Sequence, residues 1–301
     1  MANDLSNYAT KFTSKLDQAV VADSTTGVLS MNQDLVGEYQ GAGKIEIASI
    51  ALQGLGDYNR TTGFPKGDAT LTWEEYALEF DRAREFSVDD VDDEERAALL
   101  SANLMAEFVR TKVVPEVDAV RFARIATNAG TSVAETLADG AAATKSVLTA
   151  EEALQDFGAD LSQCVLFVSG KTKTQLRQAA PYQFGRGEDP ATNFQTFDDM
   201  RVQVVPRDRF FTAIDMLDGV TKSEIADELA GGFKQATAGK AINYIAMAPE
   251  AVAAIQKHEQ LRYFAPAVNQ SADAHKWQYR LYHDLLVYLN KKNLIYVSYA
   301  A

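Results

Sequence analysis

The chain has 301 residues, of which 47% are apolar, and its 42 acidic residues outnumber its 29 basic residues, giving a net charge of −13. A chain of this length and apolar content can bury a large core, and we expect two or more subdomains. So acidic a chain is a poor candidate for a protein that grips nucleic acid, because phosphate binding depends on Lys and Arg side chains.

The sequence also indicates a compartment. The single cysteine, Cys164, excludes an intramolecular disulfide and suits a reducing environment. No run approaches the roughly 20 apolar residues that span a bilayer, and the N-terminus lacks the basic start and apolar stretch of a secretion signal. We therefore expect a cytoplasmic protein with no membrane contact.

Residues 1–88 are predicted to form an arm followed by a long two-stranded ribbon. Residues 1–43 hold one amphipathic piece and then a polar, glycine-rich stretch that is too sparse in apolar side chains to form a core unaided. Residues 44–52 alternate as in a strand, and residues 70–80 return after a glycine-rich tip. Isolated two-stranded ribbons are marginal in water, so we expect this one, reaching about residue 88, to lie on another molecule.

A very long helix is predicted next, from about residue 87 to Asn128. Ser87 and the acidic residues 89–95 supply an N-cap and a first turn that suit the helix dipole. Apolar residues then recur at helical spacing, and Gly130 supplies the stop. Pro115 lies inside this helix and is expected to kink it or break it into two.

After Gly130 the pattern becomes mixed α/β. The expected strands are residues 164–168, 200–206 and 241–247. The expected helices are residues 149–157, capped by Thr149, residues 173–180, and residues 250–259. Residues 181–199 read as a long loop, and the alternation of residues 277–289 and 294–299 predicts a C-terminal hairpin.

One motif resembles a phosphate-binding loop. Ser169-Gly170-Lys171-Thr172 follows a predicted strand and precedes a predicted helix. A Walker A loop needs a glycine five positions before Gly170, and that residue is Val165. We interpret the motif as a plain strand-to-helix turn, with an α/β phosphate-binding enzyme as a distant alternative.

No other pattern predicts a catalytic or metal site. The acidic run 89–95 lacks the glycine of a calcium loop, so we interpret it as a solvated helix start, with a structural cation as the alternative. The histidines His258, His275 and His283 show no metal-ligand spacing. No nucleophile-elbow sequence supports a triad around His283 and Asp284.

Two further sets of residues are expected to pack in the interior. Cys164, in an apolar strand, is interpreted as a small core residue. Sheet packing is the expected role of the C-terminal tyrosines, namely Tyr279, Tyr282, Tyr288, Tyr296 and Tyr299. We therefore expect no catalytic residue, no bound metal and no cofactor.

Most of the chain resembles a known family. The segments that carry the resemblance are Gly54-Leu55-Gly56-Asp57-Tyr58-Asn59-Arg60, Gly63-Phe64-Pro65-Lys66-Gly67-Asp68, Leu71-Thr72-Trp73, Asp81-Arg82-Ala83-Arg84-Glu85-Phe86-Ser87-Val88-Asp89 and Phe108-Val109-Arg110-Thr111-Lys112-Val113-Val114-Pro115-Glu116-Val117-Asp118-Ala119. Weaker similarity continues through Tyr282-His283-Asp284 and Asn290-Lys291. The chain is similar, in these segments and in the order of its elements, to the major capsid protein of tailed bacteriophages, with the Hong Kong ninety-seven-like fold.

The resemblance implies an α+β fold with four parts. Residues 1–43 would be an N-terminal arm and residues 44–88 an extended β-hairpin loop. Residues 89–147 and 268–301 would form a peripheral domain with a long spine helix, and residues 148–267 an α/β axial domain. No long helical segment precedes the arm, so the resemblance implies a separate scaffold protein or a cleaved segment.

The implied function is structural. Subunits of this family assemble as pentamers and hexamers into an icosahedral shell that encloses double-stranded DNA. The implied partners are further copies of the chain, a portal, and scaffold or decoration proteins, and the implied location is the virion after assembly in the host bacterial cytoplasm. An encapsulin-type shell, which shares the fold but holds cargo enzymes, is the nearer alternative.

Contacts between subunits are expected in two places. In the extended loop they are Ile45, Ile47, Ile50, Leu71 and Trp73, the aromatic residues Tyr58 and Phe64, and the charged tip residues Asp57, Arg60, Lys66 and Asp68. In the arm they are Tyr8, Phe12 and Leu16. The acidic balance is expected to keep the inner wall from holding packaged DNA tightly.

Overall fold

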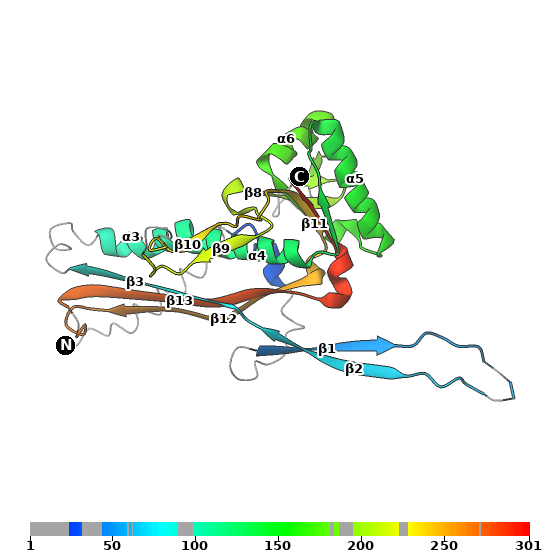
Figure 1. The fold of residues 1–301 in the computed structure, drawn as a ribbon, viewed down its shortest axis with the longest axis horizontal. Helices are drawn as coiled ribbons and strands as arrows, with labels where there is room; N and C mark the ends of the chain where they lie inside the picture. Colours follow the sequence, from blue (N-terminus) through cyan, green and yellow to red (C-terminus); the bar gives the residue numbers. More distant parts are fainter. Residues whose placement is uncertain are drawn as a thin grey trace. The chain divides into compact units, whose positions relative to one another are not determined.

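The computed structural model describes residues 24–31, 44–58, 60–61, 63–89, 99–180, 184–186, 195–222, 228–270 and 272–301. The chain divides into two compact units (Figure 1). One unit is Gln33–Glu79, and the other combines Met1–Asn32 with Phe80–Ala301. The fold is α+β, as predicted.

The smaller unit contains the predicted ribbon. Strands β1 (Lys44–Leu52) and β2 (Ala69–Ala77) pair antiparallel over their full length, from Lys44 opposite Ala77 to Leu52 opposite Ala69. The expected end of the ribbon at residue 88 is wrong, because the next strand, β3 (Phe80–Asp89), pairs in a different sheet. Ser87 and Asp89 are therefore strand residues and not the cap of a helix.

The larger unit contains a long three-stranded antiparallel sheet in the order β12-β13-β3. Its strands β12 (Val252–Phe264) and β13 (Ala274–Val287) are among the longest in the chain. Side chains alternate between half-buried and exposed along β3, as expected for a sheet with one covered face. The covering residues come from the long helix, where Met105, Val109 and Val117 join Trp277 and Leu281 in one apolar cluster.

The long helix is confirmed from Leu99 to Asn128, and residues 90–98 lie outside the described residues. It consists of α3 (Leu99–Phe108), a π-helical turn η3 (Val109–Val113) and α4 (Val114–Asn128). The break predicted at Pro115 takes the form of this π turn, in which the N–H of Val114 donates to the carbonyl of Val109, five residues earlier. Pro115 then falls in the first turn of α4, where a missing N–H costs little.

A seven-stranded mixed sheet has the order β4-β14-β11-β5-β8-β7-β6. The strands are β4 (Thr131–Ala134), β5 (Val165–Ser169), β6 (Phe184–Arg186), β7 (Gln195–Phe197), β8 (Met200–Val205), β11 (Ile242–Met247) and β14 (Ile295–Tyr299). Helices α5 (Gly140–Asp156) and α6 (Gly170–Ala179) pack on one face of this sheet (Figure 1). Helix α4 packs on the other face through Phe122 and Ile125, so both faces of the sheet are buried.

A short hairpin that was not predicted from the sequence contacts the three-stranded sheet. Its strands are β9 (Ile214–Leu217) and β10 (Gly232–Gln235). Arg82 of β3 donates to the carbonyls of Leu217 and Gly232, at 2.8 and 3.2 Å. Gly219 lies at φ +73°, a backbone conformation that residues with a side chain rarely adopt.

Short 3-10 segments complete the structure and connect the sheets. They are η1 (Gly27–Met31), η4 (Leu161–Gln163), η7 (Arg207–Arg209), η8 (Pro249–Ala251) and η9 (Leu289–Leu294).

Three local predictions are wrong. The segment 250–259 is not a helix, because after η8 it enters β12 and pairs with β13. The C-terminal runs do not form a hairpin, because β13 and β14 lie in different sheets and η9 joins them. Helix α5 is not capped by Thr149 but begins at Gly140, where the Asp139 side chain accepts from the N–H of Ala142 at 2.8 Å.

The predicted strands 164–168, 200–206 and 241–247 correspond to β5, β8 and β11. The predicted loop 181–199 contains the short strands β6 and β7, while residues 181–183 and 187–194 lie outside the described residues. The division into peripheral and axial domains stays a prediction. Strand β14 pairs with β11 and β4 in the seven-stranded sheet and does not pair with β13.

Candidate functional site and assembly surfaces

The ribbon presents one strongly apolar face. In an antiparallel pair, residues that lie opposite each other share a face of the sheet. Ile50 lies opposite Leu71, Leu52 opposite Ala69, and Trp73 opposite Ala48. The large side chains of this set remain exposed, at 62% for Ile50, 73% for Leu52, 53% for Leu71 and 60% for Trp73. We call these four residues the ribbon face.

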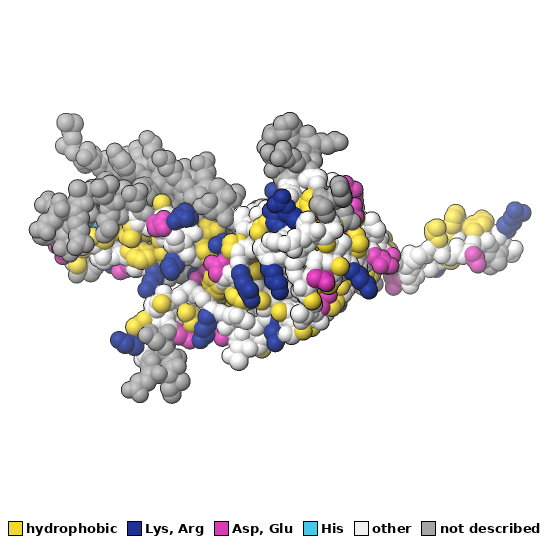
Figure 2. Space-filling view, turned by 90° about the horizontal axis from the view of Figure 1, so that it is seen from above, with side chains coloured by type: hydrophobic (Ala, Val, Ile, Leu, Met, Phe, Trp, Pro, Cys, Tyr) yellow, Lys and Arg dark blue, Asp and Glu magenta, His cyan; other side chains and the backbone are white. Residues whose placement is uncertain are grey.

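The tip of the ribbon adds aromatic and charged side chains. Phe64 and Tyr58 are exposed and contact each other edge to face, with ring centroids 5.0 Å apart. Figure 2 shows hydrophobic side chains gathered at the tip next to acidic and basic ones. The charged tip residues chosen from the sequence, namely Asp57, Arg60, Lys66 and Asp68, are all exposed.

Not every residue chosen from the sequence lies on these surfaces. Ile45 is fully buried within the single chain, and it lies on the opposite face of the ribbon from Ile50. The side chain of Ile47 and the arm residues Tyr8, Phe12 and Leu16 lie outside what the structure describes. The sequence choice missed Leu52, although it lies two residues beyond Ile50 and alternation alone would have found it.

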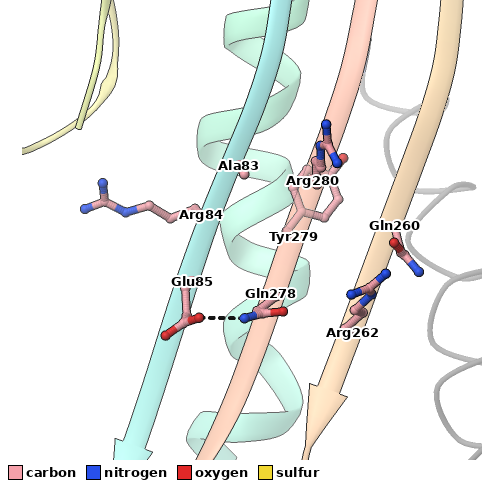
Figure 3. Close-up of a pocket in the computed structure, with 8 residues that line it drawn as sticks. All are labelled: Ala83, Arg84, Glu85, Gln260, Arg262, Gln278, Tyr279 and Arg280. Atoms are coloured by element: carbon pink, nitrogen blue, oxygen red, sulfur yellow. Dashed lines mark hydrogen bonds between the residues drawn. The ribbon is translucent and has the colours of Figure 1, made fainter. Parts of the chain in front are cut away.

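A groove of about 300 Å³ crosses the polar face of the three-stranded sheet (Figure 3). Its lining residues are Ala83, Arg84, Glu85, Gln260, Arg262, Gln278, Tyr279 and Arg280. Glu85 accepts from Gln278 at 2.7 Å and from Lys276 at 3.1 Å, and these contacts hold the pKa of its carboxyl below the ordinary range. Arg280 pairs with Asp81. Glu85 and Arg280 are thus paired within the sheet, and Arg84 donates to the carbonyls of Gly219 and Leu229.

His283 and Asp284 do not form a catalytic pair. They are neighbours on β13, so their side chains point to opposite faces of the sheet. Burial, together with the charges of Arg121 and Arg82, lowers the pKa of His283 to about 3. Asp284 is fully buried and instead pairs with Arg124 at 3.2 Å. The arrangement is structural.

Cys164 is a core residue, as predicted. Its side chain is fully buried, and burial raises the pKa of the thiol to about 11. The Sγ atom donates to the carbonyl of Asp160 at 3.3 Å. A thiol with so high a pKa carries almost no thiolate at neutral pH and is a poor nucleophile.

Most of the C-terminal tyrosines lie in the sheets. Tyr279 and Tyr296 are buried, and the Tyr296 ring stacks on that of Tyr244. Among the residues that the structure describes, no three or more His, Cys, Asp or Glu side chains are placed to hold a metal ion. Residues 90–95 of the acidic run are not among them. Within the same described part of the chain, no helix is both long and apolar enough to cross a membrane.

The Ser169-Gly170-Lys171-Thr172 turn uses its polar groups locally. Ser169 caps α6 by accepting from the N–H of Thr172 at 3.2 Å, and its hydroxyl lies 2.9 Å from that of Thr172. The Thr172 side chain is buried. Both hydroxyls of the turn and the Thr172 N–H are therefore already engaged, as in an ordinary strand-to-helix turn.

We expect neither ATP nor inorganic phosphate to bind this turn. Titration of the folded chain should give no saturable signal, and Lys171→Ala should behave as the unchanged chain does, because no backbone cradle surrounds the lysine. Saturable binding that Lys171→Ala abolishes would revive the enzyme alternative.

An unusual carboxyl group lies beside the β7–β8 turn. Glu151 of α5 is buried, and its Oε1 atom has no hydrogen-bond partner among the described residues. Asp198 and Asp199 form the two-residue turn at φ 43° and 71°, the geometry of a type I′ hairpin. Burial first, and then the charge of Asp198, raises the pKa of Glu151 to about 8. Glu151 is therefore mostly protonated at neutral pH.

This shift makes the stability of the fold depend on pH. The ordinary pKa of a Glu is 4.5, so between 4.5 and about 8 the folded chain holds a proton that the unfolded chain releases. Stability must fall as pH rises through this window. Glu151→Gln is expected to raise the Tm at about pH 8.5 and to leave it nearly unchanged at about pH 4. The exposed neighbour Glu152, changed to Gln, is the control. Parallel pH profiles for Glu151→Gln and the unchanged chain would contradict this assignment.

No protein-family model and no curated protein sequence matches the chain. Solved structures do match it. The capsid of the cyanophage P-SCSP1u superposes with a TM-score of 0.58 at 11% identity, covering 87% of this chain and 85% of that one. The mature capsid of bacteriophage PhiM1 gives 0.58 at 11% identity, covering 86% and 82%.

A third structure, a virus-like particle from Pyrococcus furiosus, gives a TM-score of 0.51 at 11% identity, covering 95% of this chain and 99% of that one. At identities this low, a superposition shows similarity of fold alone, and the three structures agree in that similarity. The chain has the phage capsid fold, the Hong Kong ninety-seven-like fold that its sequence resembles.

Proposed function

We propose that the chain is a major capsid subunit, which assembles through pentamers and hexamers into an icosahedral shell around double-stranded DNA. The observation that carries the proposal is the ribbon face, four large apolar side chains on a two-stranded ribbon, in a chain with the phage capsid fold. Two strands cannot bury both of their own faces. A neighbouring copy is the partner that this fold supplies.

Energetics support burial of the ribbon face in an assembly. A fully buried large apolar side chain contributes on the order of 2 kcal/mol before ordering costs. Each copy both gives and receives such a contact, and closed symmetry repeats it around the shell. The tip residues Asp57, Arg60, Lys66 and Asp68 would add ion pairs between copies, each worth about 1 kcal/mol or less. Such pairs favour the correct register more than they add affinity.

The remaining roles follow from the same proposal. Ile47, Tyr58 and Phe64 would join the contacts of the extended loop, and Tyr8, Phe12 and Leu16 those of the arm. The chain would act with a portal and with scaffold or decoration proteins, and it would be found in the virion after assembly in the host bacterial cytoplasm. It would have no catalytic activity. The net charge of −13 would keep enclosed DNA from adhering to the wall.

The second candidate is an encapsulin-type shell that encloses protein cargo. The likeness to the Pyrococcus furiosus particle, which spans 95% of this chain, favours it. Electron microscopy of purified particles, with an assay for nuclease-protected nucleic acid, separates the two candidates. Icosahedral shells that contain double-stranded DNA support the capsid proposal. Shells that contain only protein support the alternative, and a monomer under all conditions contradicts both.

A further inference from the structure

A short N-terminal segment is held on the long helix by a single buried carboxylate. Asp118 of α4 is fully buried. Its oxygens accept from the hydroxyls of Ser24, Thr25 and Thr26 at 2.7, 2.6 and 2.6 Å. They also accept from the N–H groups of Thr25 and Thr26 at 3.0 and 3.3 Å, and from Arg209 at 3.3 Å. Five of these six contacts come from three consecutive residues that lie more than 90 positions away in the sequence.

A second charged side chain on the same helix completes the contact. The Arg121 guanidinium donates to the Thr26 hydroxyl at 2.8 Å and to the Thr26 carbonyl at 3.4 Å. The Thr26 hydroxyl thus accepts from Arg121 while it donates to Asp118. Burial lowers the pKa of Arg121, and the charge of Asp118 opposes that effect. The two charges and the turn therefore bind one another in the interior, while the Arg121 Nε atom is buried without a hydrogen-bond partner among the described residues.

An apolar anchor follows the polar contact. Leu29 of η1 is fully buried in the main core cluster, which also contains Phe122 of α4. The segment 24–31 is therefore fixed by a polar turn at one end and by a core leucine three residues later. It belongs to the larger unit, although the chain then passes through the whole smaller unit before it returns at Phe80.

The return point is held by the same helix. The Arg124 guanidinium lies 5.0 Å from the ring centroid of Phe80, the first residue of β3, and Arg124 is itself held by Asp284. The Phe80 ring also stacks on His283, with centroids 6.0 Å apart. Asp118, Arg121 and Arg124 are spaced three residues apart on α4. Helix α4 thus contacts the described segments that precede and follow the smaller unit in the sequence.

We propose that α4 carries an intramolecular binding site for the Ser24-Thr25-Thr26 turn, formed by Asp118, Arg121 and Arg209, and that this site is what keeps segment 24–31 folded onto the larger unit. Its ligand class is a hydroxyl-rich turn whose three hydroxyls and two of whose amides donate to one carboxylate. The consequence for assembly rests on the proposed function: a segment that is already ordered in the free subunit has less conformational freedom to lose when subunits assemble. The anchoring itself does not depend on that function.

The test is amide hydrogen exchange of segment 24–31 by mass spectrometry, on folded, unassembled subunits. Asp118→Asn preserves shape but removes the charge and replaces one acceptor with a donor. We expect exchange in this segment to rise about tenfold or more while peptides from β5 and β11 keep their protection. The matched control is Glu116→Gln, which removes a charge from the same helix, where Glu116 pairs with Arg82 and not with the segment.

A second variant covers the case in which Asp118→Asn fails to fold. Ser24→Ala with Thr25→Val leaves the helix untouched and removes two of the hydroxyl donors. It is expected to raise exchange in the same segment severalfold. Unchanged exchange in this variant overturns the proposal, as does a rise in Asp118→Asn that Glu116→Gln reproduces.

Particle yield, measured in parallel, distinguishes failure of the anchor proposal from failure of the proposed function. If the unchanged chain forms shells while the segment exchanges equally in all variants, the anchor is overturned and the shell stands. If the segment responds as expected while no chain forms shells, the anchor is supported and the capsid proposal fails.

Discussion

Shell formation should be lost when the ribbon face is made acidic. The change is Ile50→Asp together with Trp73→Asp, two side chains that are about 60% exposed in the single chain. Each substitution removes apolar burial on the order of 2 kcal/mol and places a charge in an apolar contact, which costs several kcal/mol more. Since roughly 1.4 kcal/mol is tenfold in an equilibrium constant, we expect the yield of particles to fall by about a hundredfold or more.

The measurement is sedimentation or microscopy of particles, with circular dichroism and Tm to show that the subunit remains folded. Thr70→Asp is the matched control, because Thr70 is exposed, lies beside Leu71 and faces the other side of the ribbon. It adds a charge without altering the ribbon face and should reduce particle yield far less than the double variant does. Normal shells from the Ile50 and Trp73 double variant would contradict the role given to the ribbon face.

Loss of the Phe122 ring should destabilise the subunit more than loss of an exposed ring. Phe122 is fully buried between the long helix and the seven-stranded sheet, with its ring 5.4 Å from that of Phe167 and 4.9 Å from that of Phe210. Phe122→Ala should cost about 3–5 kcal/mol, the range for a large core cavity. That is a large part of the roughly 5–15 kcal/mol that holds a typical domain folded.

Chemical denaturation of unassembled subunits measures this effect. Phe157→Ala is the matched control, because Phe157 ends α5 with more than half of its side chain exposed. We expect a change within about 0.5 kcal/mol for that variant, as for surface substitutions in general. Equal losses in the two variants would mean that Phe122 does not occupy the junction between helix and sheet.

The parts of the fold with a clear period were predictable. Alternation defined β1 as a strand, although its phase changes between Ile47 and Ile50, and a charge-free apolar run defined β5. Helical spacing together with Pro115 defined the broken long helix. The segment after Pro249 misled, because its alanines suit a helix when read alone and become a strand only through pairing with β13. The strand that pairs with β14 could not be predicted either, because local alternation predicts a strand but not the sheet that it joins.

The candidate surfaces also differ in how much of each could be predicted from the sequence. Ile50, Leu71 and Trp73 of the ribbon face were chosen from the sequence, but Ile45 and Ile47 of the opposite face were chosen with them, because the apolar pattern changes phase within β1. The anchor at Asp118 could not be predicted from the sequence. A single acid on a helix is normally a solvated residue, and the partners of Asp118 lie more than 90 residues away. The one signal was the hydroxyl run Ser24-Thr25-Thr26, which has no meaning until the fold supplies a buried acceptor.

A density map of assembled particles at side-chain resolution tests the central claim most directly. We expect Ile50, Leu52, Leu71 and Trp73 of each copy to be covered by a neighbouring copy in a closed icosahedral shell with double-stranded DNA inside. A map, or a structure of a stable monomer, in which these four side chains lie against their own polypeptide and no other copy touches them would contradict it.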